Sequence, residues 1–271
     1  MANIYLASLF TNKSQHWKHR LASEVYEDRT FELVPIPAGC TKTHPEDKTY
    51  DDIPSHRDPR KSLAAALGFE LGRSKQHAHD DPDLHTGFGY GDVWGPKSAA
   101  LFDATPGDWL LIIANLAFAS KPGRPDFSNH RTGWHFVGCL KIGAVDFAGN
   151  GHFHSATFAW HQHARDAKKF RYDMAEGDIS MIVAGKKKAT AQRFANAVPV
   201  LSETDASELL RDKLGNPLNA EPFPTVMSCI GSYTRGIRVI ARTDESHDRS
   251  YLAKLRSTLI TSNPNAEEVL W

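Results

Sequence analysis

The chain has 271 residues, of which 41% are apolar and 24% are charged, and this ordinary usage excludes a disordered or fibrous protein. Its 32 basic residues balance 32 acidic ones, which excludes binding to nucleic acid through overall positive charge, although a local basic face is compatible with a zero sum. Three cysteines without a Cys-x-x-Cys pair exclude a disulfide framework and a cysteine zinc site. Without a signal-peptide pattern or a membrane-length apolar run, we expect a cytoplasmic protein that does not enter membranes.

The first half of the chain is expected to hold two strands and two helices. Short apolar runs predict strands at Ile4–Phe10 and Phe31–Pro37, and helical spacing of apolar residues predicts helices at His16–Asp28 and Ser62–Leu71. Cys40 to Arg60 is rich in Pro, Asp, Thr and Lys and is expected to be a long loop. Loops of this length are uncommon inside compact domains and are often functional.

The second half begins with the two most apolar strands of the chain. Trp109–Leu116 and Trp134–Ile142 are joined by a polar loop, which predicts an antiparallel pair. Further strands are expected at Ile179–Ala184 and Gly236–Arg242, and helices at Asp205–Leu214 and Asp248–Ile260. Short strands mixed irregularly with helices, without alternating βαβ units, favour one α+β domain over residues 1–271, built on an antiparallel sheet or barrel.

A cluster of titratable residues lies at positions 77–85, which read His-Ala-His-Asp-Asp-Pro-Asp-Leu-His. Histidine and carboxylate side chains at this density can bind a divalent metal or supply an acid and a base, and the mixture suits zinc, iron or manganese alike. The metal ligands would be His77, His79 and Asp81. The alternative is a solvated turn, because Asp-Asp and Asp-Pro are common turn chemistry.

Glycines at positions 87, 89, 91 and 95 follow this cluster directly. Their spacing is not the Gly-x-Gly-x-x-Gly of a dinucleotide-binding fold, and no phosphate-binding P-loop sequence occurs. A flexible backbone here would let Phe88, Tyr90 and Trp94 present flat faces on which bases stack. The alternative is that these aromatic side chains anchor the loop on the core.

Two further segments offer polar groups. The loop at positions 50–58 carries Tyr50, Asp52 and a histidine, and it gains significance only if it folds against the 77–92 segment. The run Lys186-Lys187-Lys188 is either a solvated loop or a patch that faces phosphate.

These motifs together resemble the nucleotide-modification-associated domain proteins, and most closely the third type of that group. The resemblance rests on four motifs in chain order: Val34-Pro35-Ile36-Pro37, Tyr50-Asp51-Asp52-Ile53, His79-Asp80-Asp81-Pro82-Asp83-Leu84, and Pro106-Gly107-Asp108 before an apolar strand. It spans roughly residues 30–185, and the chain departs from the family pattern at Ala7-Ser8-Leu9-Phe10, where Ser-Arg-Lys-Gly is expected. It implies a link to bacterial or phage systems that make or handle modified DNA bases. The residues on matching positions are Tyr50, Asp51, Asp52, His79, Asp81 and Asp83.

A second likeness concerns the central strands. Gly107-Asp108-Trp109-Leu110-Leu111-Ile112 and Gly133-Trp134-His135-Phe136-Val137-Gly138 are similar to the central hairpin of PUA-like barrels, including the EVE and ASCH types. This likeness implies an antiparallel, partly barrel-like sheet with flanking helices, in a class of proteins that commonly bind nucleic acid or modified bases.

Two functions follow as expectations. The first is a component of a nucleotide or DNA base-modification system that acts on or binds a modified nucleobase, with its site in residues 77–92. In that function the acid, base or metal-binding groups would be His79, Asp81 and Asp83, and the pocket would be completed by Tyr50 and Asp52. The base would be bound by Phe88, Tyr90, Trp94, Lys186 and Lys187. The second is a non-catalytic PUA-like reader of modified bases in nucleic acid, which needs the aromatics and the lysines only. A third, a structural partner of other proteins in a modification operon, has no specific motif behind it.

Overall fold

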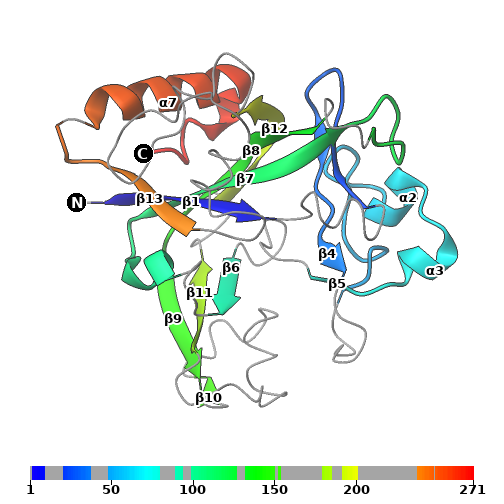
Figure 1. The fold of residues 1–271 in the computed structure, drawn as a ribbon, viewed down its shortest axis with the longest axis horizontal. Helices are drawn as coiled ribbons and strands as arrows, with labels where there is room; N and C mark the ends of the chain where they lie inside the picture. The colour runs from blue at the N-terminus through cyan, green and yellow to red at the C-terminus, as the bar shows by residue number, and fades with distance from the viewer. Residues whose placement is uncertain are drawn as a thin grey trace.

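The computed structural model describes residues 2–9, 21–37, 48–79, 89–93, 99–126, 132–149, 152–153, 179–184, 191–200, 237–246 and 248–271. Within these ranges seven strands form a main sheet, four strands form a second sheet, and two short strands pair separately. Figure 1 shows helix α7 along one side of the main sheet, the second sheet below it, and the short helices α2 and α3 beside its far end.

The main sheet is built around β7 (Trp109–Phe118) and β8 (Thr132–Lys141), which pair antiparallel as predicted. Most β7 side chains are buried, because Trp-Leu-Leu-Ile-Ile-Ala-Asn-Leu-Ala-Phe is apolar on both faces. The strand order is β12 (Ala191–Pro199), β8, β7, β1 (Asn3–Leu9) and β13 (Ile237–Arg242).

Two strands follow one another along the same edge of β7. β1 runs parallel to β7 as far as Ala114, and β2 (Ser23–Val25) runs parallel to it from Leu116 onward. β3 (Phe31–Glu32) then pairs antiparallel with β2 and places Glu32 opposite Glu24. This end of the sheet therefore carries two carboxyl groups on adjacent strands.

The expectation of an antiparallel, partly barrel-like PUA-like sheet is wrong. β7 pairs in parallel with β1 and with β2, so the main sheet is mixed. In the part of the chain that the structure describes, β12 and β13 end the sheet and do not pair with each other, so no barrel closes. The β7–β8 hairpin that suggested the likeness is present, but local sequence does not encode the distant, parallel partners that β7 takes on its other edge.

The main sheet is accompanied by helix α7 (Arg249–Ser262) and by a second, four-stranded sheet. α7 buries Tyr251, Leu252, Leu255 and Leu259 against the main sheet, as its apolar spacing predicts. The second sheet has the order β10 (His152–Phe153), β9 (Ala144–Gly149), β11 (Ile179–Ala184) and β6 (Gly89–Val93).

Residues 48–79 form a small lobe beside β2 and β3. Its core contains Tyr50, Ile53, Leu63, Leu67 and Ala78, together with Leu21 and Val34 from the preceding segment. α2 (Leu63–Leu67) begins at Ser62, whose hydroxyl accepts a hydrogen bond from the Ala65 amide at 3.1 Å, and ends at Gly68 with a φ of 65°. α3 (Leu71–Ser74) follows, and β5 (Ala78–His79) pairs with β4 (Ile36–Pro37).

Two predicted helices differ from the structure and one lies outside it. The helix expected over 62–71 is divided by Gly68, because a left-handed residue ends α2 after five residues. The end of the helix expected over 16–28 is the strand β2 and the turn after it, while residues 10–20 and the helix expected at Asp205–Leu214 lie outside the described residues. No helix within the described ranges is both long and apolar enough to span a membrane.

Candidate functional site

A cavity lies between strand β2 and the small lobe. Its volume is about 540 Å³, within the range of roughly 300–1,000 Å³ that is usual for small-molecule sites. The lining residues come from three segments, namely Leu21, Ala22 and Glu24, then Leu67, Gly68, Phe69, Glu70, Gly72, Arg73 and Gln76, then Gly123 and Pro125. The cavity therefore joins parts of the chain that are far apart in sequence.

Glu24 is the buried carboxyl group of this cavity, with only 2% of the residue exposed. The Tyr26 hydroxyl donates a hydrogen bond to Glu24 Oε2 at 2.7 Å, and the Gly123 amide donates one to the same oxygen at 3.1 Å. Among the described residues none donates to the other oxygen, Oε1. Glu24 therefore lines the cavity with one carboxyl oxygen held by two hydrogen bonds and the other without a donor among the described residues.

The environment of Glu24 raises its pKa from 4.5 to about 7. Burial is the main cause, because an enclosed carboxylate loses its hydration, and Glu32 on the adjacent strand raises the pKa further. The hydrogen bonds from Tyr26 and Gly123 and the Arg57 guanidinium lower it without cancelling the effect of burial. A carboxyl group with a pKa near 7 in a cavity is suited to give or take a proton at neutral pH.

Gly123 lies where only glycine fits. Its φ is 72°, in the left-handed region, and a Cβ atom at this position would collide with the Leu67 carbonyl oxygen. The close approach allows the Gly123 amide to reach Glu24 from the loop after β7. These two contacts hold the loop against Glu24 on β2 and against Leu67 in the small lobe.

The small lobe contributes an aromatic residue, Phe69, and a positively charged residue, Arg73, to the lining of the cavity. The Arg73 guanidinium lies over the Phe69 ring, 5.6 Å from its centroid, and the Tyr50 ring packs edge-on against Phe69 with centroids 5.4 Å apart. Phe69 is half-buried, whereas Tyr50 is fully buried and its hydroxyl donates to the Pro35 carbonyl at 2.9 Å. The wall thus combines a flat apolar face with a positive charge.

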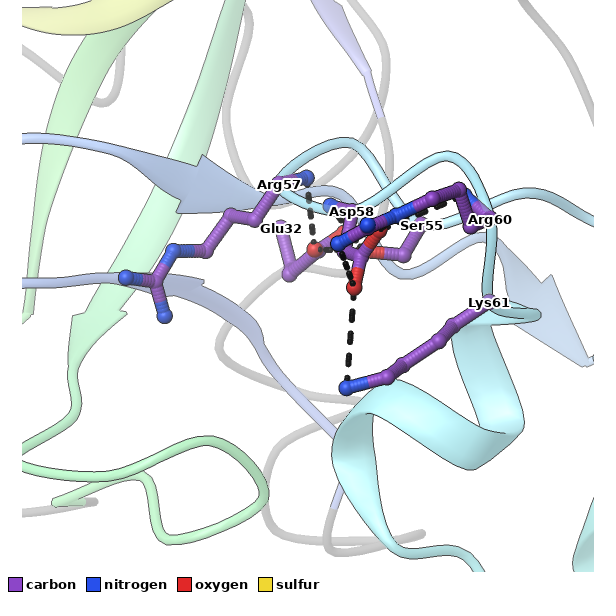
Figure 2. Close-up of polar contacts among 6 residues, drawn as sticks. All are labelled: Glu32, Ser55, Arg57, Asp58, Arg60 and Lys61. Atoms are coloured by element: carbon purple, nitrogen blue, oxygen red, sulfur yellow. Dashed lines mark hydrogen bonds and ion pairs between the residues drawn. The ribbon is translucent and has the colours of Figure 1, made fainter.

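Glu32 fastens the small lobe to the sheet. Its carboxylate accepts hydrogen bonds from the Ser55 hydroxyl, from the His56 amide at 2.8 Å and from the Arg57 amide at 2.9 Å. Figure 2 shows the Arg57 amide facing Glu32 while its side chain extends away from the carboxylate. That guanidinium lies 4.1 Å from the Tyr26 ring centroid and 3.6 Å from the Asp28 carboxylate.

His56 is a structural histidine in this arrangement. Its Nε2 lies 2.6 Å from the Phe194 carbonyl oxygen on β12, and its ring centroid lies 4.6 Å from that of Phe31. Burial lowers the pKa of His56 to about 3, so the ring is neutral near pH 7 and donates its Nε2 hydrogen to the carbonyl. The contact ties the 55–58 segment to the far strand of the main sheet.

The structure brings the two predicted loops together at their ends. The Ala78 amide donates to the Lys48 carbonyl at 2.9 Å, the Asp51 amide donates to the Ser74 carbonyl at 3.1 Å, and Thr49 forms a bridge with His77. Residues 48–51 therefore lie beside residues 74–78.

Asp52 stands next to this junction. Its carboxylate accepts hydrogen bonds from the Thr49 hydroxyl at 2.6 Å and the Thr49 amide at 2.8 Å, and these lower its pKa. Electrostatic interactions with Lys75 and His77 lower the pKa of Asp52 further. Asp52 and His77 thus lie near each other at this junction, and the partly exposed His79 follows on β5, opposite Ile36.

The remaining predicted site residues are placed as follows. Tyr90, on β6, is 1% exposed and packs within the main core. Outside the described residues lie Asp81, Asp83, Phe88, Trp94, Lys186 and Lys187. Within the described part of the chain, no group of three or more His, Cys, Asp or Glu side chains is arranged to hold a metal ion.

Sequence reasoning did not find Glu24, Phe69, Arg73 or Gly123. Glu24 stands between Ser23 and Val25 in a short strand, and nothing in that pattern distinguishes a buried glutamate from a surface one. Two prolines flank Gly123 closely in Lys121-Pro122-Gly123-Arg124-Pro125, which indicates a constrained turn. That is the one local signal that could have drawn attention to this side of the cavity.

Comparison with known proteins identifies a family. The profile of the family described as nucleotide modification associated domain 3 matches residues 16–246, which include the Glu24 cavity, the small lobe and most of the main sheet. No curated protein and no solved structure matches the chain significantly. The chain belongs to the nucleotide modification associated domain 3 family.

Proposed function

We propose that this protein binds a nucleobase-bearing ligand in the Glu24 cavity, as its part in a nucleotide-modification system. The observation that carries the proposal is a buried carboxyl group in the lining of a cavity of about 540 Å³, with a pKa of about 7 and with one oxygen held by Tyr26 and Gly123. Membership of the family supports a ligand of the nucleotide class, and the cavity is the place that we propose for it.

The walls of the cavity suit a nucleobase. The half-buried Phe69 ring lines the cavity, and stacking of a base on an aromatic ring typically contributes roughly 1–3 kcal/mol. Glu24 Oε1 can accept a hydrogen bond when ionised and donate one when protonated, so it can bind the polar edge of a base and exchange a proton with it.

Equilibrium binding tests this proposal. Titration calorimetry with the 5′-monophosphates of adenosine, guanosine, cytidine and thymidine is expected to give binding to the wild-type protein, weakened about tenfold or more by Glu24→Ala, which removes at least one hydrogen bond. The matched control is Glu27→Ala, because Glu27 is exposed in the turn three residues later and lies outside the cavity. Equal affinities in wild-type protein and in correctly folded Glu24→Ala would overturn the proposal.

We also propose a second candidate site for the same function, the segment 77–92. The observation that favours it is that residues 48–51 lie beside residues 74–78. In this proposal His77, His79 and Asp81 bind a divalent metal or act as acid and base, with Asp52 beside them. Metal analysis by mass spectrometry on untagged protein is the test, with the variants His79→Ala and Asp81→Ala alongside. One metal per chain, lost in both variants, would support a metal site, and a metal-free wild-type protein would refute one.

A further inference from the structure

The loop after β7 carries two positively charged residues at sequence positions adjacent to residues that line the cavity. Lys121 and Arg124 are exposed and stand next to Gly123 and Pro125, both of which line the cavity. Neither forms an ion pair with another residue of the described chain. A third cation, Arg73, lines the cavity from the opposite wall.

Other cations near the small lobe are engaged by carboxylates. Asp58 accepts Arg60 at 2.8 Å and lies 3.6 Å from Lys61, and Lys75 lies 3.0 Å from Asp51. Figure 2 shows Arg60 and Lys61 converging on Asp58. Within the part of the chain that the structure describes, the two loop cations thus have no carboxylate partner, while these lobe cations do.

The loop is held in one shape before any ligand arrives. The Asp126 amide donates to the Phe118 carbonyl at 2.8 Å, and the Arg124 amide donates to the Lys121 carbonyl at 3.1 Å. Pro122 and Pro125 fix two φ angles, and Gly123 is tied to Glu24. Less backbone entropy is lost when such a preorganised loop binds an anion.

We infer that Lys121 and Arg124 bind a phosphate group of the ligand whose base lies at Glu24. The ligand class is then a phosphorylated nucleotide, free or within a strand, and not a free base or nucleoside. Arginine and lysine are the usual partners of phosphate oxygens in proteins, and a loop that positions both near a base-binding carboxyl group supplies both parts of nucleotide recognition. The inference rests on the proposed function.

The test compares each nucleoside with its 5′-monophosphate and with a single-stranded octanucleotide, on wild-type protein and on the double variant Lys121→Ala/Arg124→Ala. The wild-type protein is expected to bind the phosphorylated ligand at least about tenfold more tightly than the nucleoside, and the double variant is expected to lose that preference. Preference for the octanucleotide over the monophosphate would identify a strand as the source of the phosphate, and the reverse would identify a free nucleotide.

The matched control is Arg60→Ala/Lys61→Ala, which removes the same charge from the small lobe at residues bound to Asp58. Equal loss in both double variants would show a general charge effect and overturn the inference. Nucleosides that bind as tightly as their phosphates, with binding still dependent on Glu24, would overturn it and leave the proposed function standing. Failure of every ligand to bind wild-type protein would refute the proposed function itself.

Discussion

At the scale of single residues, Glu24 combines burial with a place in the lining of a cavity. Gln is an informative substitution here, because its carbonyl can accept from Tyr26 and Gly123 while its amide mimics the neutral acid towards the cavity. The Glu24→Gln variant therefore keeps the local hydrogen bonds and removes only the titration.

The raised pKa makes a prediction about stability and pH. Folding raises the pKa of Glu24 from 4.5 to about 7, so the folded state holds the proton more tightly and the contribution of Glu24 is fully present below about pH 4.5. It is lost as the pH rises through about 7. Relative to Glu24→Gln, the wild-type free energy of unfolding is expected to fall by on the order of 3 kcal/mol between about pH 5 and about pH 8, measured by urea denaturation. Parallel pH profiles for the two proteins would contradict this account of Glu24.

Gly123 gives a second prediction at this scale. Gly123→Ala combines an unfavourable left-handed φ with a collision against Leu67, so it is expected to reduce the free energy of unfolding by roughly 2 kcal/mol or more. Gly68→Ala is the control, because Gly68 has a φ of 65° but open space around its Cβ position, and it should cost about 1 kcal/mol. Equal losses in the two variants would show that the contact with Leu67 is not tight.

At the scale of elements, Glu32 holds the small lobe on the sheet through the Ser55 hydroxyl and two backbone amides. In Glu32→Gln, an amide NH2 group, which donates hydrogen bonds, replaces one of the two carboxylate oxygens that accept them. At least one buried donor of the small lobe is then left without an acceptor. A loss of roughly 2 kcal/mol is expected, together with faster hydrogen exchange of the His56 and Arg57 amides. Unchanged exchange at these amides, beside a Glu27→Gln control, would show that other contacts hold the lobe.

The elements also show what the sequence could predict. The limits of β11 and the buried face of α7 agree with the predictions, because apolar runs and helical spacing are local properties. The helix expected over 16–28 was wrong at its end, because the partners of β2 are β3 and β7 and not its sequence neighbours. The parallel pairing of β1 with β7 joins segments about a hundred residues apart, and no local pattern records it.

At the scale of the whole molecule, the candidate site is assembled from distant parts. Glu24 comes from strand β2, Phe69 and Arg73 from the small lobe, and Gly123 from the loop after β7. Sequence motifs led correctly to the family and drew attention to Tyr50, which packs directly behind Phe69. They could not reveal the cavity, because burial of one glutamate is a property of the folded chain. The proposed site at 77–92 stays a prediction.

A crystal structure of the protein with a bound nucleotide distinguishes the Glu24 cavity from residues 77–92 as the binding site. Crystals are soaked with the tightest-binding of the four monophosphates. The account predicts a base stacked near Phe69, with a polar atom about 3 Å from Glu24 Oε1 and its phosphate near Lys121 and Arg124. A nucleotide bound against residues 77–92, with the Glu24 cavity unchanged, would contradict it.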